Sequence, residues 1–242
     1  MPQVSILRPG KYKFTWSWYK LVLFATGVGN TTLSRKQAPL KAESCIFTMP
    51  VETEIKFRID DLPGLTRHLE SAGFRLQTPR SFESNVLYDT PGRQMRARTE
   101  ILRIRTYAGR TTLTHKRLPD HGPGEDTHKH RIETETEVSD GQALAQVFLS
   151  LGLVAAFRYE KWRTEWQDGQ GHCVVDETPI GNYAELEGPA AWIDRAAARL
   201  AVDPSRYITL SYGRLFDLWR EQHNSAAQDL TFAAVGQPSP AG

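Results

Sequence analysis

Strict alternation of apolar and charged residues recurs along this chain of 242 residues, and it constrains the fold more than any other feature. In a β-strand, successive side chains point to opposite faces, so a period of two separates an apolar face from a polar one. Residues 51–59 show the pattern without interruption, with Glu52, Glu54, Lys56 and Arg58 on one face. This stretch is therefore predicted to be a strand with one apolar and one charged face.

The same pattern predicts eight strands, and the helical spacing of apolar residues predicts four helices. The strands are expected at residues 51–59, 84–89, 101–107, 110–117, 130–138, 158–167, 172–178 and 182–188. The helices are expected at residues 61–72, 140–151, 190–201 and 209–221. A composition of 40% hydrophobic and 24% charged residues excludes a wholly disordered chain, and two cysteines exclude a disulfide framework.

The charged faces of these strands carry pairs of one sign. Acidic pairs occur at positions 52/54, 133/135 and 185/187, and basic pairs at 56/58, 103/105 and 161/163. Like charges on one face repel. An open sheet with a solvated charged face fits the alternation, and so does a closed barrel whose charged faces line a wet lumen. The pairing favours the barrel, so the predicted fold is α+β, mainly antiparallel β, with an eight-stranded closed tunnel flanked by helices.

Two sets of charged side chains would share this lumen. The basic set is Lys56, Arg58, Arg103, Arg105, Lys116, Arg131, Lys161 and Arg163. The acidic set is Glu52, Glu54, Glu133, Glu135, Asp176, Glu185 and Glu187. Arginine offers paired donors to phosphate oxygens, and carboxylates are the ligands that Mg²⁺ or Mn²⁺ takes. The ligand that balances both sets is a polyphosphate, such as a nucleoside triphosphate, with one or two divalent ions.

Several of these residues also stand in a familiar order. Glu52-Thr53-Glu54-Ile55-Lys56 resembles the E-x-E-x-K motif of the CYTH family, the triphosphate tunnel metalloenzymes. Leu102-Arg103-Ile104-Arg105 follows Tyr88-Asp89-Thr90-Pro91-Gly92 as in that family. The later matching positions are Lys116, Glu133, Glu135, Lys161, Arg163, Asp176, Glu185 and Glu187. The resemblance covers residues 50–221, and Ser211-Tyr212 opens a last helix as in many members.

The resemblance implies an eight-stranded antiparallel tunnel and roles for these residues. Glu52, Glu54, Glu185 and Glu187 would bind the metal, with Glu133, Glu135 and Asp176 nearby. The triphosphate would be held by Lys56, Arg58, Arg103, Arg105, Lys116, Lys161 and Arg163. The catalytic residues are expected to be Glu52, Glu54, Lys56 and Glu187. The hydroxyl group of Tyr212 has either a functional or a helix-packing role.

The expected function is that of a Mg²⁺- or Mn²⁺-dependent enzyme acting on a triphosphate. Its sequence is most similar to the class IV adenylate cyclases, which convert ATP to cyclic AMP and pyrophosphate. The alternatives are an inorganic or thiamine triphosphatase and a non-catalytic polyphosphate-binding protein. The expected partner is ATP, tripolyphosphate or thiamine triphosphate, and a homodimer is left open. Neither a membrane nor a nucleic acid is expected as a partner, and the predicted location is cytoplasmic.

The charge distribution divides the chain. Residues 1–48 carry seven basic residues and one acidic residue, a net charge of +6, whereas the rest carries 23 basic and 27 acidic residues, a net charge of −4. Residues 1–48 are interpreted as a disordered or mis-assigned extension before a start at Met49, with a signal peptide or a nucleic-acid contact as alternatives. Residues 49–223 are expected to form the CYTH domain, and the polar segment 224–242 a disordered tail.

Overall fold

A computed structural model describes residues 51–120 and 127–239 of the chain. The predictions for residues 1–48 therefore lie outside the described residues. Among the described residues, no helix has the length and apolar character needed to cross a membrane.

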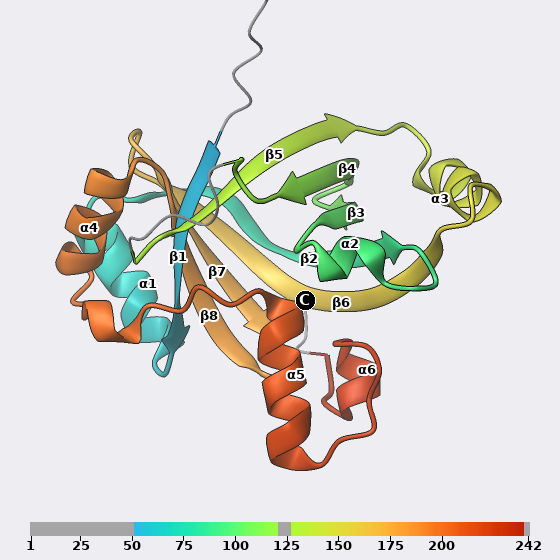
Figure 1. Ribbon diagram of the computed structural model, residues 1–242. Coiled ribbons are helices and arrows are strands. Elements are labelled where there is room, and N and C mark those ends of the chain that lie inside the picture. Colours follow the sequence, from blue (N-terminus) through green and yellow to red (C-terminus); the bar gives the residue numbers. More distant parts are fainter. Residues whose placement is uncertain (1–50, 121–126, 240–242) are drawn as a thin grey trace, which may run out of the picture. The chain divides into compact units, whose positions relative to one another are not determined.

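Eight antiparallel strands close into a barrel (Figure 1). The strands are β1 (Val51–Ile59), β2 (Arg75–Asp89), β3 (Ile101–Tyr107), β4 (Arg110–Arg117), β5 (Lys129–Glu137), β6 (Val154–Gln167), β7 (His172–Thr178) and β8 (Gly181–Glu187). Their order around the barrel is β1-β5-β4-β3-β2-β6-β7-β8. Closure leaves each strand with one face toward the lumen and one face outward, which confirms the predicted fold.

Six α-helices accompany the barrel in the described residues. They are α1 (Leu62–Ser71), α2 (Gln94–Ala97), α3 (Gly141–Ser150), α4 (Ala190–Arg199), α5 (Tyr212–His223) and α6 (Phe232–Val235). The four longer helices match the prediction. Asp61 and Asp140 begin α1 and α3 by accepting hydrogen bonds from backbone N–H groups three residues on.

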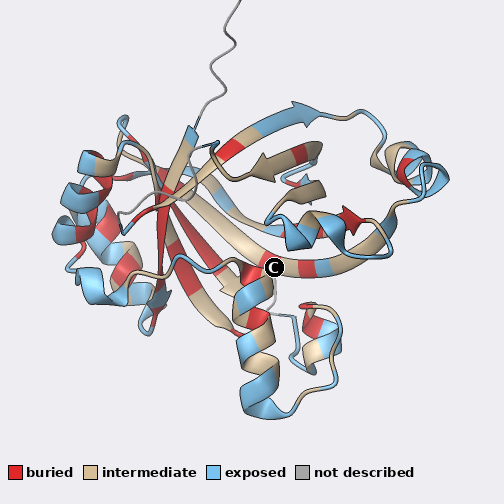
Figure 2. Cartoon of the chain, viewed as in Figure 1, coloured by how far each residue is buried: buried red, intermediate tan, exposed pale blue. Residues whose placement is uncertain are grey.

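Helices α1 and α4 cover the outer, apolar face of β1, β7 and β8 (Figures 1 and 2). Ile55, Leu186 and Ile193 are each 0% exposed in this core. Burial of the odd-numbered residues of β1 on this side directs Glu52, Glu54 and Lys56 into the lumen. The hydrophobic core therefore sets the orientation of the charged face.

Two strands begin earlier than the sequence pattern indicates. Strand β2 begins at Arg75 rather than at residue 84, and β6 begins at Val154 rather than at residue 158. The pairing of β2 with β6 shifts register between Leu76 and Thr78 and again between Thr78 and Ser81. Such bulges interrupt the period of two, so the alternation is lost there although the backbone remains extended. The extension adds Glu83 to the lumen.

The C-terminal segment completes the sheet where neighbouring strands separate. Strand β1 pairs with β5 only as far as Glu54, and beyond this point Ile208 exchanges two backbone hydrogen bonds with Lys56. Strand β6 pairs with β7 from Trp162 onward, and before this point Leu230 bonds to the backbone of Arg158 and Glu160. The prediction of a disordered tail is wrong for residues 224–239, because Leu230 is 0% exposed and α6 follows it.

Candidate functional site

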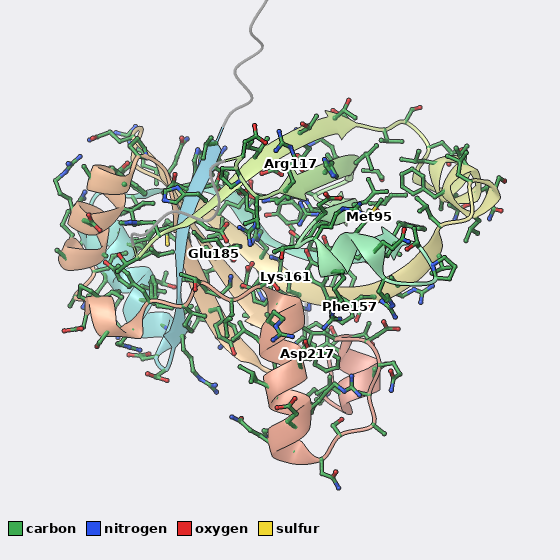
Figure 3. The ribbon with its side chains drawn as sticks, viewed as in Figure 1. Met95, Arg117, Phe157, Lys161, Glu185 and Asp217 are labelled. Atoms are coloured by element: carbon green, nitrogen blue, oxygen red, sulfur yellow. The ribbon has the colours of Figure 1, made fainter. Side chains whose placement is uncertain are left out.

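The lumen holds charged side chains that are almost fully removed from solvent. Lys56 and Lys161 are each 2% exposed, and Glu83 and Asp176 are each 0% exposed. Figure 3 shows Lys161 and Glu185 together inside the barrel. Buried charges are stable when they are paired. The pairs divide into a central network and a second group of carboxylates toward the start of β1.

Asp176 on β7 is the main acceptor of the central network. Its Oδ2 accepts hydrogen bonds from Lys161 Nζ at 2.8 Å, Arg163 Nη2 at 2.7 Å and Tyr212 Oη at 2.6 Å. Its Oδ1 accepts from Arg163 Nε at 2.7 Å. These donors occupy both oxygens of the carboxylate. Asp176 therefore orients cations in this structure and has little capacity left for a metal ion.

Glu185 on β8 is the second acceptor. Lys56 Nζ lies 2.6 Å from one of its oxygens and Arg163 Nη2 lies 2.7 Å from the other. Burial alone would raise the pKa of Glu185, but Lys56, Arg163 and Lys161 lower it well below its ordinary value. Glu185 is therefore ionised and neutralises cations that face the lumen.

Glu83 is a lumen residue that the sequence pattern missed. Its carboxylate lies 3.4 Å from Lys161 Nζ, 3.7 Å from Arg163 Nε and 3.9 Å from Arg105 Nε. Asn85 Nδ2 donates to its Oε1 at 2.9 Å. Burial acts to raise the pKa of Glu83, but the surrounding cations lower it to about 2. The signal was present in the sequence, because Glu83 precedes Asn85 by two positions on the same strand face.

Four carboxylates crowd the lumen near the start of β1. Lys116 Nζ lies 2.5 Å from Glu52 and 3.0 Å from Glu133, and Lys129 contacts Glu54. Glu187 is the β8 partner of Glu54 in the strand register. Lys129 lies one residue before the predicted strand 130–138, which explains why the sequence pattern missed it.

Carboxylates outnumber lysines in this group, and burial makes two of them resist ionisation. Burial raises the pKa of Glu52 to about 8, with Lys116 opposing the shift and Glu54, Glu187 and Glu133 adding to it. Burial also raises the pKa of Glu187. A carboxylate that resists ionisation beside other carboxylates marks a place where a further cation would be stabilised.

The remaining predicted residues lie at different depths. Arg103 donates to Tyr159 Oη at 3.0 Å and to Thr114 Oγ1 at 3.1 Å, and Glu135 lies 3.7 Å from its guanidinium. Arg131 pairs with Glu52 in the β1–β5 register and is half-buried. Arg58 is exposed near the end of β1, with its guanidinium beside Gly181. The structure thus brings together the predicted charges except Arg58, which lies apart from the network.

The fold and the site define a class: a closed antiparallel tunnel whose lumen carries cations and carboxylates in about equal measure. Residues 50–194 match the CYTH domain. The chain belongs to the CYTH domain family.

One relative is similar in sequence, and two solved structures share the fold. A Methanocaldococcus jannaschii protein named a putative adenylate cyclase is 29% identical over 139 residues, covering 57% of this chain and 76% of that protein. The structure of a putative adenylate cyclase from Vibrio parahaemolyticus has a TM-score of 0.59 at 18% identity, covering 69% of this chain and 97% of that one. A protein of Pyrococcus horikoshii OT3 has a TM-score of 0.57 at 20% identity, covering 66% and 96%.

Proposed function

We propose that this protein is a divalent-metal-dependent enzyme that binds a triphosphate inside the barrel and acts on it. The observation that carries the proposal is the burial of a cation cluster and a carboxylate cluster in one lumen. Lys56, Lys161 and Arg163 converge on the centre of the lumen, while Glu52, Glu54, Glu133 and Glu187 outnumber Lys116 and Lys129, the described lysines that contact this group. A metal-bound polyphosphate matches both clusters, because its anionic oxygens would bind the cations and its metal ion would bind the carboxylates.

The carboxylates near the start of β1 fit Mg²⁺ or Mn²⁺ by the chemistry of their donors. Among the described residues, no group of three or more histidine, cysteine, aspartate and glutamate side chains is already arranged around a metal position. Instead, Lys116 bridges Glu52 and Glu133, and Lys129 contacts Glu54. The residues that would hold the ion are Glu52, Glu54, Glu133 and Glu187. When bound, the ion would neutralise phosphate charge and lower the pKa of a coordinated oxygen nucleophile.

Two reactions use such a site. In the cyclase reaction, the ribose 3′-hydroxyl of ATP attacks the α-phosphorus and pyrophosphate leaves. In the triphosphatase reaction, water attacks the terminal phosphorus of tripolyphosphate or thiamine triphosphate. In either reaction Lys56, Arg103, Arg105, Lys161 and Arg163 would bind phosphate oxygens and neutralise the charge of the transition state. The similarity to proteins named adenylate cyclases favours the first reaction, and the triphosphatase is the second candidate because the same charge sets serve it.

Product analysis tests the proposal. The purified protein is incubated with ATP, tripolyphosphate or thiamine triphosphate, each with Mg²⁺ or Mn²⁺. Cyclic AMP with pyrophosphate supports the cyclase, and orthophosphate supports the triphosphatase. If neither product forms and calorimetry detects triphosphate binding, the protein is a non-catalytic binder. Absence of both turnover and binding would overturn the proposal.

Glu187→Gln separates the enzyme from the binder. The change keeps the size of the side chain but removes one charged oxygen ligand, so kcat is expected to fall at least about 100-fold while triphosphate binding persists. Glu137→Gln is the matched control, because Glu137 is an exposed residue at the end of β5. Equal kcat values for wild type and Glu187→Gln would remove Glu187 from the catalytic machinery.

A further inference from the structure

Tyr212 opens helix α5 and extends its hydroxyl group into the central network. The residue is 8% exposed, and its Oη donates to Asp176 Oδ2 over 2.6 Å. Its ring also lies beneath two ammonium groups, with Lys56 Nζ 4.5 Å and Lys161 Nζ 4.8 Å from the ring centroid. Tyr212 thus contacts the acceptor of the network and two of its donors at once.

The hydroxyl group is suited to donate. Burial, together with Asp176 and Glu185, raises the pKa of Tyr212 well above its ordinary value. The proton therefore stays on the phenol, and the short contact to Asp176 is a hydrogen bond from a neutral donor to a carboxylate.

Tyr212 is also the most firmly held of the groups that contact Asp176 Oδ2. Lys161 and Arg163 reach this oxygen on long side chains with several rotatable bonds, whereas a tyrosine ring is placed by two. The ring of Tyr212 packs 6.2 Å from that of Tyr159 and 5.8 Å from that of Tyr183. Without the phenol, Asp176 would be held, among the described residues, only by Lys161 and Arg163, the cations that it orients.

The start of α5 is held in turn by the chain on both sides of it. Ile208 is hydrogen-bonded to the backbone of Lys56, and Ser211 accepts from the backbone of Arg214 at the beginning of the helix. Phe216 and Leu230 belong to the same apolar cluster as Tyr212 and are 1% and 0% exposed. Figure 1 shows this end of α5 directed at the barrel. These contacts therefore hold the phenol of Tyr212 in place beside Asp176.

We propose that Tyr212 is a positioning residue that fixes Asp176, and through it Lys161 and Arg163, in the geometry that binds the phosphate chain. The inference rests on the proposed function and adds to it a residue from outside the barrel strands. The competing explanation is that Tyr212 serves packing alone. The two explanations differ in what the hydroxyl oxygen contributes.

Tyr212→Phe tests the difference, because it keeps the ring and removes the oxygen. Tyr183→Phe is the matched control: its ring packs on Tyr212 in the same cluster, and no hydrogen bond to its hydroxyl group is found among the described residues. A hydrogen bond to a charged group accounts for about a tenfold effect or more. For Tyr212→Phe we expect the Kd of tripolyphosphate without metal, and the KM for turnover with metal, to rise about tenfold, and kcat to fall as well, because Lys161 and Arg163 also neutralise the transition state.

Thermal unfolding and a crystal structure of Tyr212→Phe without ligand complete the test. The expected structure has Lys161 and Arg163 displaced or in alternative rotamers, with α5 unmoved. Unchanged KM and unchanged cation positions would overturn the inference, as would equal KM increases in Tyr212→Phe and Tyr183→Phe. If wild type binds no triphosphate, the proposed function fails, and the positions of Lys161 and Arg163 in the variant still decide whether Tyr212 orients them.

Discussion

Glu83 shows how much a single buried charge matters in this lumen. It is 0% exposed and lies within 4 Å of Lys161, Arg163 and Arg105, so it neutralises part of three cations at once. One oxygen of the carboxylate, Oε2, has no hydrogen-bond partner in the described residues and is held by charge alone. Removing such a group leaves cations buried without compensation.

Glu83→Gln is therefore expected to lower the free energy of unfolding by about 3 kcal/mol near neutral pH. Tripolyphosphate should restore part of the loss, because its anionic oxygens replace the missing charge. Chemical denaturation with and without tripolyphosphate measures both effects. Glu177→Gln is the control, since Glu177 pairs with Arg80 where both side chains are partly exposed, and about 1 kcal/mol is expected. Equal losses in the two variants would contradict the role assigned to Glu83.

At the scale of residues, the period of two predicted most of the lumen. It identified Lys56, Arg163 and Glu185 because each lies on a regularly alternating strand. It missed Glu83 because the predicted strand begins at residue 84, one position after this residue. It also grouped Asp176 with the metal ligands, since a sequence shows which charges face the lumen but not which of them neutralise one another across the barrel.

Helix α2 is an element that periodicity could not predict. It has four residues and follows Arg93 in the left-handed conformation, with φ of 57°. The segment is held by Asp89, whose carboxylate accepts hydrogen bonds from the backbone N–H groups of Thr90, Met95 and Arg96. Burial acts to raise the pKa of Asp89, but the bonds from Arg96, Met95 and Thr90 lower it below the ordinary 3.8.

Asp89→Asn should expose this contribution through its pH dependence. A lowered folded-state pKa stabilises the protein above the unfolded pKa, and the stabilisation is lost as pH falls through the folded value. We expect the free energy of unfolding of wild type to exceed that of the variant by about 1–2 kcal/mol at about pH 7. The difference is expected to shrink below about pH 4. Urea denaturation at several pH values measures it. Asp60→Asn, at an exposed pair with Arg206, should show a much smaller effect.

The segment after α5 was predicted from its composition to be disordered, and this prediction is wrong. Its small and polar residues indicate disorder, yet Leu230 is fully buried and its backbone pairs with β6. Leu230→Ala should lower the free energy of unfolding by about 2–4 kcal/mol, which thermal or chemical denaturation measures. Leu218→Ala, at a side chain that is 44% exposed on α5, should change it by less than about 0.5 kcal/mol. Similarly small losses of unfolding free energy in both variants would mean that Leu230 adds nothing to the hydrophobic core.

At the scale of the molecule, the lumen links ligand binding to stability. A ligand that binds the folded state alone stabilises it by about 2.7 kcal/mol at 100 times its Kd, which corresponds to a rise in Tm of about 5–10 °C for a chain of this size. Tripolyphosphate with Mg²⁺ should produce this shift in a thermal scan. Orthophosphate at equal ionic strength is the control, because it spans less of the cation set. Equal shifts with both would argue against a site for a phosphate chain.

The closed barrel itself was predictable, because like-signed pairs on the charged faces favour a closed lumen over an open sheet with a solvated face. The places where closure depends on the C-terminal segment were not predictable. Ile208 and Leu230 pair with strands that are distant in sequence, and nothing in their residue types indicates which strand each pairs with. These contacts form where the pairing of β5 with β1 ends and where the pairing of β7 with β6 has not yet begun. Only the assembled sheet shows these positions.

The pairing of Leu230 with β6 has a consequence for synthesis on the ribosome. The chain emerges from its N-terminus, so β1 cannot pair with β8 and close the barrel until β8 has been made. The edge of β6 before Trp162 cannot pair until the segment with Leu230 has been made. Until then, backbone groups next to buried lysines are open to other chains, which is the condition for aggregation. A message truncated after the codons for α5 would thus yield a chain with its charged residues present and its sheet unfinished, a natural substrate for cellular quality control.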